Sequence, residues 1–267
     1  MTRIVGSHVI RTRCCGHFFS TPAYASINYS AQEYWTDGYM GMSLAPRTAL
    51  RQCVCGACYF LGQADVVHTV YGERWKPPAP AGWETRADNW LTRLFGRESR
   101  VQVMQRYDTR TKEQTAAAKS ILPEPARQVQ DTDLKRLIAE GGHQPNVEIE
   151  LRTLYWHCLN HQLREVYRKF RSRYTKVGPD GCSLEFPGFE PTQEQLANMQ
   201  ALILALESQA EPRMLDLAEL YRELGEMGTA RHWLDCHERS GQGLVGRGFV
   251  IGRMVQSGVP CPIRYRS

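Results

Sequence analysis

The sequence predicts an α+β protein in which a small, β-rich, cysteine-rich module precedes a mainly α-helical, repeat-like domain. Three observations predict this class. Five of the nine cysteines fall in the first sixty residues, a proline-containing polar stretch follows them, and apolar residues then recur at three- and four-residue steps. The 267 residues, 42% hydrophobic and 23% charged, have the composition of a soluble globular chain.

The chain divides into four segments on composition and pattern. They are the cysteine module at residues 1–72, a polar linker with a short helix at 73–142, the helical domain at 143–240 and a Gly/Arg-rich C-terminal tail at 241–267. The tail has many glycines and no acidic residue, so we expect it to be flexible or hairpin-like.

Turn and strand signals organise the first segment. The Asp37-Gly38 pair lies among aromatic residues and predicts a hairpin between the two groups of cysteines. The stretch "LGQADVVHTVYG" then closes the module as a strand. In the linker, "ETRADNWLTRLFG" has helical spacing and ends at Gly96, whereas residues 106–130 are polar and form a connector.

Helical periodicity dominates the second half. Residues 146–174 carry apolar side chains at three- and four-residue steps, which predicts one continuous or once-broken amphipathic helix. Thr192 and Gln195 have the spacing of a capping box that opens the next helix. The stretch "LAELYRELGEMGTARHWL", Leu217 to Leu234, places small and apolar residues around a Leu-Gly turn.

This last stretch resembles the middle of a tetratricopeptide repeat. Leu224, Gly225 and Ala230 occupy the positions of that motif's packing residues. The resemblance covers one repeat and implies a helical hairpin that binds a protein partner. An ordinary antiparallel helical hairpin remains the alternative, because stable arrays usually contain at least about three repeats.

Two short stretches, "CCGHFF" from Cys14 and "CVCGACYF" from Cys53, share cysteines, a glycine and aromatic residues in the same order. Together they resemble a zinc ribbon, whose two metal knuckles each present a cysteine-glycine turn. Glycine adopts the backbone conformation that lets amides point at thiolate sulfur, and four soft ligands satisfy tetrahedral zinc. The resemblance implies a structural Zn²⁺ held by residues from the set Cys14, Cys15, Cys53, Cys55 and Cys58.

The exact ligands stay open at this point. Cys15, Cys55 and Cys58 are predicted first, and the fourth ligand comes from Cys14, Cys53 or His17. Thr12 and Gln52 stand where the first cysteine of each regular knuckle would be, so the spacing departs from the usual ribbon. Cys55 and Cys58 also suit a thioredoxin-like redox pair, and a reduced cluster without metal is a third interpretation.

A basic stretch within the long predicted helix indicates a charged surface. Its candidate contact residues for a protein partner or nucleic acid are Arg164, Arg168, Lys169, Arg171 and Arg173. The aromatic residues between them fall on the apolar face of the same helix, which favours a core role for those rings. The basic side chains are therefore expected to face solvent or a partner.

The location follows from what the sequence lacks. No apolar run approaches the roughly 18 to 20 residues that cross a bilayer, and the N-terminus does not have the pattern of a secretory signal. We therefore expect a cytoplasmic protein without membrane association, in which cysteines are thiols or metal ligands. The sequence does not predict its oligomeric state.

The functional hypothesis is a non-enzymatic, zinc-binding adaptor whose helical domain binds a protein partner. It rests on a cysteine cluster and amphipathic helices without a catalytic constellation. One alternative is a nucleic-acid-binding zinc protein that uses the basic helix. The other is a thiol-disulfide oxidoreductase that uses Cys55 and Cys58.

Overall fold

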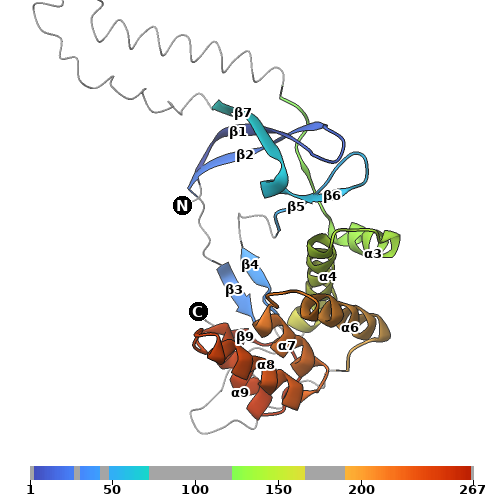
Figure 1. Cartoon of the computed structure of the whole chain (residues 1–267). Coiled ribbons are helices and arrows are strands. Elements are labelled where there is room, and N and C mark those ends of the chain that lie inside the picture. Colours follow the sequence, from blue (N-terminus) through green and yellow to red (C-terminus); the bar gives the residue numbers. More distant parts are fainter. Residues whose placement is uncertain (1–2, 27–30, 43–47, 72–121, 166–189, 266–267) are drawn as a thin grey trace, which may run out of the picture. The chain divides into compact units, whose positions relative to one another are not determined.

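The computed structural model confirms the α+β class and describes residues 3–26, 31–42, 48–71, 122–165 and 190–265. Its internal contacts divide the chain into two compact units (Figure 1). Neither unit is a continuous stretch of sequence. Unit 1 combines Met1–Asn28 with Arg51–Gln128, and unit 2 combines Tyr29–Leu50 with Val129–Ser267. The predicted helix at residues 84–96 lies outside the described residues.

Unit 1 contains a three-stranded antiparallel sheet in the order β2-β1-β7. The strands are β1 (Arg3–Arg11), β2 (Phe18–Ser26) and β7 (Asp65–Tyr71), the last of which confirms the strand predicted in "LGQADVVHTVYG". β1 and β7 approach closely at Gly6, where an added Cβ would lie 2.1 Å from the Val70 carbonyl oxygen. Only glycine fits this crossing without backbone movement.

A second small sheet of unit 1 has the order β6-β5-β8. Its strands are β5 (Leu50–Gln52), β6 (Cys58–Phe60) and β8 (Arg127–Gln128), and a 3₁₀ turn, η1 (Leu61–Gln63), follows β6. The segment that leads into β8 also pairs with β2. Ser20 N–H donates to Glu124 O and Ala126 N–H donates to Ser20 O, both at 2.9 Å.

Residues 124–128 therefore pair with the strands of both cysteine-bearing hairpins. The sequence assigned them to a linker, and the structure corrects this: they form part of unit 1. Ala126 packs against one core cluster of the unit, whose buried members are Ile10, Phe19, Cys53 and Tyr59. This shared strand segment holds the two hairpins side by side.

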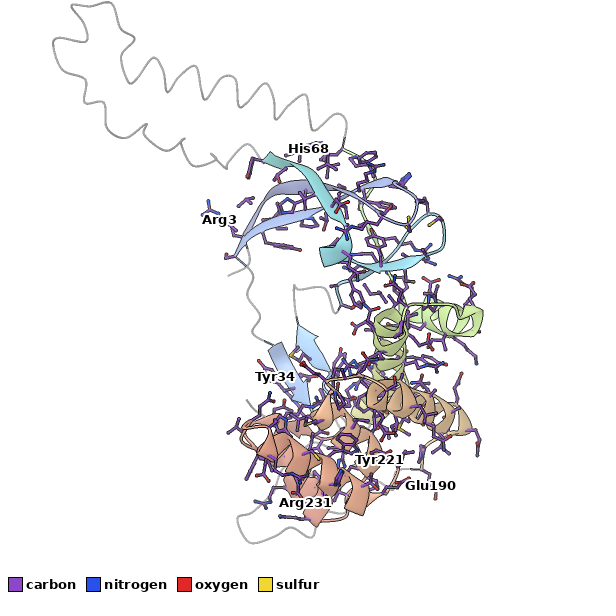
Figure 2. The ribbon with its side chains drawn as sticks, viewed as in Figure 1. Arg3, Tyr34, His68, Glu190, Tyr221 and Arg231 are labelled. Atoms are coloured by element: carbon purple, nitrogen blue, oxygen red, sulfur yellow. The ribbon has the colours of Figure 1, made fainter. Side chains whose placement is uncertain are left out.

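The hairpin predicted at Asp37-Gly38 forms, but it belongs to unit 2. It consists of β3 (Ala31–Trp35) and β4 (Met40–Met42), and β3 pairs on its other edge with β9 (Arg264–Tyr265). The ring of Tyr34, which Figure 2 labels, lies 5.8 Å from the ring of Tyr265 by centroid distance. The predicted 1–72 module thus includes a segment, 29–50, whose contacts are with the helical unit. This segment belongs to the helical unit because its side chains Trp35 and Asp37 are buried there.

The helices of unit 2 are α3 (Asp131–Glu140), α4 (Pro145–Leu159), α6 (Gln193–Glu207), α7 (Met214–Glu223), α8 (Met227–Arg239) and α9 (Arg247–Gln256). In the described part of the long predicted helix, α4 ends at Leu159, Asn160 lies in a turn, and helix resumes over 161–165. The capping box is confirmed, because Thr192 Oγ1 accepts from Gln195 N–H and Gln195 Oε1 accepts from Thr192 N–H.

One apolar core joins three of these helices. Its fully or nearly buried members are Ile149, Trp156, Met199, Leu202, Ile203, Leu206, Leu217 and Leu220. α7 and α8 pack as a hairpin around a turn at Gly225, whose positive φ of 81° suits glycine. None of the helices in the described ranges is long and apolar enough to span a membrane.

The segment expected to be a flexible or hairpin-like tail is instead largely ordered. Its α9 packs on α7 and α8, with Ile251 fully buried beside Leu234 and Ala230. Its strand β9 completes the sheet of β3 and β4. Apolar residues at helical spacing within "RGFVIGRMVQ" explain the difference, since they bury one face despite two glycines.

Candidate metal centre

The first cysteine loop connects β1 to β2. Thr12 N–H donates to His17 O at 2.9 Å, and Gly16 N–H donates to Thr12 O at 2.9 Å, so the chain reverses within six residues. Gly16 has a φ of 73°, a left-handed conformation that side chains with a Cβ rarely adopt. The loop leaves Cys14 and Cys15 exposed at its tip.

The second cysteine loop connects β5 to β6 and is built in the same way. Cys53 N–H donates to Ala57 O at 2.8 Å, Gly56 N–H donates to Cys53 O at 2.9 Å, and Gly56 has a φ of 89°. A hairpin loop with a left-handed glycine before the closing residue is a common three-residue connection. This loop presents Cys55 on the surface and keeps Cys53 buried.

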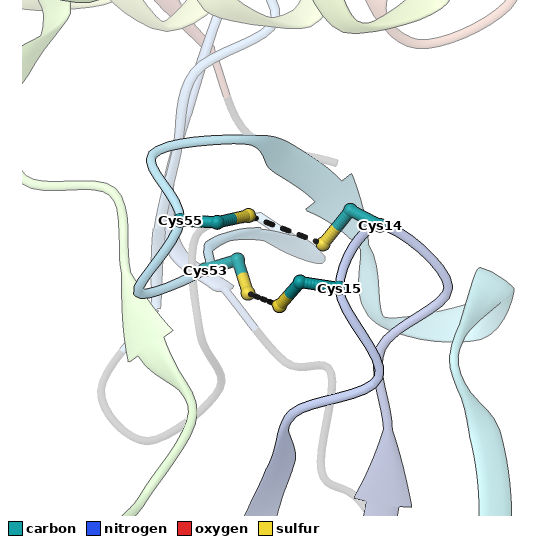
Figure 3. A group of neighbouring side chains, drawn as sticks. All are labelled: Cys14, Cys15, Cys53 and Cys55. Atoms are coloured by element: carbon teal, nitrogen blue, oxygen red, sulfur yellow. Dashed lines mark hydrogen bonds between the residues drawn. The ribbon is translucent and has the colours of Figure 1, made fainter.

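The two loops bring four cysteine sulfurs together. The Sγ atoms of Cys14, Cys15, Cys53 and Cys55 all lie within 4.8 Å of one another. Cys15 and Cys53 are the closest pair at 3.3 Å, and Cys14 and Cys55 lie 3.6 Å apart (Figure 3). Four sulfurs at about 2.3 Å from one tetrahedral ion would lie about 3.8 Å from each other. The group can therefore hold a metal ion with little rearrangement.

Four of the five predicted cysteine ligands belong to this group, and one does not. Cys58 was predicted among the first ligands from its two-residue spacing to Cys55, and it is not a member. The loop closes at Ala57, so Cys58 is the first residue of β6 rather than part of the turn. His17 is also outside the group; its ring packs on Phe19 and its Nε2 lies 3.5 Å from Glu124.

Thr12 occupies the place where the regular knuckle would have a cysteine, and it still contacts the group. Its Oγ1 lies 3.7 Å from the Sγ atoms of both Cys15 and Cys53. The side chain is 1% exposed and also donates to His17 O. Thr12 therefore gives the sulfurs a buried hydroxyl contact from beneath the first loop.

The thiols of the group differ in acidity. The His17 backbone N–H, followed by the Cys53 and Thr12 side chains, lowers the pKa of Cys15 to about 6. Desolvation, reinforced by Cys53 and Cys55, raises the pKa of Cys14 to about 12, and burial also raises the pKa of Cys53. Four thiolates would repel one another, and a bound divalent cation removes that repulsion.

The chain was compared with protein-family models, curated proteins and solved structures, and none of them matches it. The interpretation of the four-cysteine group rests on the geometry of the two loops.

Unit 2 contains a buried charge network that sequence reasoning missed. The Asp37 carboxylate forms an ion pair with Arg164 and accepts from Asn160 Nδ2 at 3.2 Å. The guanidinium of Arg164 also donates to His157 O and lies over the Tyr39 ring, 4.1 Å from its centroid. Asp37, Asn160 and Arg164 are each 1% exposed.

Arg164 is therefore not a surface residue, and its expected contact with a protein partner or nucleic acid is corrected. The helical periodicity placed it beside other basic residues, but its side chain pairs with the Asp37 carboxylate of the β3–β4 hairpin. Arg168, Lys169, Arg171 and Arg173, the other predicted contact residues, lie outside the described residues.

Two more arginines, the buried Arg222 and the partly buried Arg247, join elements of unit 2. Arg222 forms a two-point ion pair with Glu219 on the same helix and donates to Val259 O beyond α9. Arg247 pairs with Asp216 at 2.6 Å and donates to Thr36 O in the β3–β4 turn. These contacts tie α7, the C-terminal segment and the hairpin together, so the network stabilises the fold of the unit.

Glu223 lies at the centre of the network and carries a testable pH dependence. Its carboxyl group accepts from Trp156 Nε1 at 2.8 Å and from Asn160 Nδ2 at 3.2 Å. Burial, together with the nearby Glu219 and Asp37 carboxylates, raises the pKa of Glu223 well above its ordinary value. The folded chain thus holds a proton that the unfolded chain releases above about pH 4.5.

Because the folded state binds more protons in this window, the Glu223 contribution to stability falls as pH rises from about 5 toward the raised pKa. We expect Glu223→Gln to remove this dependence, so that the variant gains stability relative to the wild type between pH 5 and pH 8. Urea unfolding at both pH values measures the difference. Glu219→Gln breaks the ion pair with Arg222 and should lower stability at both pH values. It should also weaken the pH dependence, because the Glu219 carboxylate contributes to the raised pKa of Glu223.

Proposed function

We propose that the chain is a zinc-binding protein in which one structural Zn²⁺ joins the two cysteine loops of unit 1. The observation that carries the proposal is the group of four sulfurs within 4.8 Å. Four thiolates give zinc a closed tetrahedral shell, which is the arrangement of structural sites rather than catalytic ones. Cys14, Cys15, Cys53 and Cys55 would be the ligands.

The size of unit 1 supports a structural role for the metal. Three short strands of two or three residues form its second sheet. The buried apolar residues in its described part are Val5, Val9, Ile10, Phe19, Ala23, Cys53, Tyr59 and Val70. Small cores of this kind are commonly supplemented by a metal or by disulfides. A metal that bridges the loops would fix the ends of both hairpins at once.

The same proposal assigns unit 2 to the binding of a protein partner, without enzymatic activity of its own. Support comes from the α7–α8 hairpin, whose sequence resembles one tetratricopeptide repeat, a motif that binds other proteins. A cytoplasmic location is part of this proposal, because a reducing compartment keeps the four cysteines available as thiolates.

Metal analysis tests the zinc site. The chain purified without added metal is expected to contain about one zinc per molecule by elemental analysis. Cys55→Ser should remove most of it, whereas Cys58→Ser, a matched change two residues beyond Gly56, should retain it. An S₄ site also suits iron, so the analysis must quantify both metals. A metal-free wild type, or equal losses in the two variants, would disprove the assignment.

Partner binding is tested with the full chain. A protein that copurifies with the wild type should bind the purified chain directly, with a fixed stoichiometry in calorimetry. Leu234→Asp is the comparison variant, because Leu234 is fully buried between α8 and α9 and its change disrupts the hairpin packing. Efficient turnover of a substrate by the isolated chain would contradict the adaptor role.

A further inference from the structure

The four-cysteine group has a second chemical property, which arises from how its sulfurs pair across the two loops. Two sulfur–sulfur contacts, of 3.3 Å and 3.6 Å, each join one cysteine of the first loop to one cysteine of the second. Three of the four thiols, those of Cys14, Cys15 and Cys55, are on exposed residues, so a small solute reaches the group from solvent.

Geometry selects among the possible disulfides. A disulfide usually joins residues whose Cα atoms are about 4.4–6.8 Å apart, whereas neighbours in sequence are held at about 3.8 Å. Cys14 and Cys15 are neighbours, which disfavours a bond within the first loop. Each cysteine of the first loop is then expected to bond to a cysteine of the second loop. The sulfur–sulfur contacts indicate that Cys15 pairs with Cys53 and that Cys14 pairs with Cys55.

We infer that the group is an oxidation site at which hydrogen peroxide converts the four thiols into two disulfides, Cys15–Cys53 and Cys14–Cys55, with release of the metal. The pairing follows from the loop geometry alone, and only the metal release rests on the proposed zinc site. The product differs from that of a thioredoxin-like pair, because Cys58 takes no part in it.

The chemistry balances for each pair. A thiolate attacks one peroxide oxygen, the O–O bond breaks, and a sulfenic acid and water result after protonation. The thiol across the gap then attacks the sulfenic sulfur, the S–S bond forms and a second water leaves. Two thiols lose two electrons to one peroxide. The whole group therefore consumes two peroxides and yields four waters.

Zinc itself is not oxidised in this reaction. A disulfide sulfur no longer carries the thiolate charge that binds the cation, so each bond removes two ligands. We expect the first disulfide to weaken metal binding strongly and the second to complete the release. The oxidised group still joins the two loops, now through covalent bonds in place of the ion.

The first test treats the full chain with peroxide and follows three quantities. Free thiols should fall from nine to about five, a colorimetric chelator should detect zinc release in parallel, and mass spectrometry should find the two cross-loop disulfides. A disulfide between Cys55 and Cys58, or oxidation to sulfinic acid without disulfides, would overturn the inference. Zinc release without peroxide is the blank to subtract.

The second test uses variants that keep two of the four cysteines and replace the others by serine. The variant that retains Cys15 and Cys53 is expected to form a disulfide faster than the variant that retains Cys15 and Cys55. The variant that retains Cys14 and Cys55 should likewise form its disulfide faster than the variant that retains Cys14 and Cys53. All four variants lack a complete metal shell, so their rates are compared at a temperature at which hydrogen exchange shows β1 and β2 still protected. Equal rates would overturn the pairing.

The outcomes separate the two proposals. A wild type without zinc that still forms the two cross-loop disulfides disproves the metal site and supports the oxidation site. A wild type with zinc that forms other disulfides, or none, supports the metal site and disproves the pairing.

Discussion

Removal of the proposed zinc ion by a strong chelator is expected to destabilise unit 1 while helices α6, α7 and α8 stay folded. Apparent binding free energies of structural zinc in small peptides are about 10–16 kcal/mol, a contribution that unit 1 would lose with the ion. Hydrogen exchange read by mass spectrometry measures both units at once. Peptides from β1 and β2 should lose protection, and peptides from the helices of unit 2 should keep it.

Two comparisons control this experiment. Adding zinc back should restore protection in β1 and β2, which excludes irreversible damage by the chelator. Cys55→Ser should exchange like the chelated wild type, because Cys55 belongs to the four-sulfur group. Unchanged protection in β1 and β2 after complete metal removal would show that the ion does not stabilise the unit.

Asp37→Ala is expected to destabilise unit 2 by about 3–5 kcal/mol. The change leaves the Arg164 guanidinium buried without its carboxylate, and breaking a buried ion pair by removing one partner has this cost. It also removes the acceptor of one hydrogen bond from Asn160. Urea unfolding followed by tryptophan fluorescence reports the change, because Trp35 and Trp156 are buried in the same unit.

Asp235→Ala is the matched control for Asp37→Ala. Asp235 also pairs with an arginine, Arg231, at 2.9 Å, but both side chains are 45% exposed. Exposed ion pairs contribute roughly 0–1 kcal/mol, so this variant should unfold close to the wild type. Similar losses in the two variants would mean that burial of the Asp37 pair contributes nothing.

The cysteine loops were predictable because their signals are local. A cysteine, a left-handed glycine and flanking strand residues all lie within six or seven positions, and the same pattern occurs twice. The ligand set was less predictable. The rule of two-residue spacing selected Cys58, but which cysteines join the four-sulfur group depends on where each hairpin closes. That point, Ala57 in the second loop, is set by backbone hydrogen bonds that the sequence does not display.

The partner of Arg164 was not predictable from local patterns. Asp37 lies 127 positions earlier in the chain, in a stretch that reads as part of the cysteine module. Periodicity assigns arginine to a polar face, and only the tertiary fold supplies the carboxylate that allows its burial. The strand β8 was missed for a related reason. A strand of two residues is too short to show an alternating apolar pattern, and its partner β5 lies far away in the sequence.

The sheet of β4, β3 and β9 has a consequence for the order in which the chain can fold during synthesis. β3 begins at residue 31, yet the strand that pairs with its free edge begins at residue 264. The ribosome therefore releases the hairpin more than two hundred residues before its last partner exists. Domains generally complete folding as each one emerges, but unit 2 cannot complete this sheet until residues 264 and 265 have been synthesised. Until then the free edge of β3, with the large ring of Trp35, has no strand to pair with it.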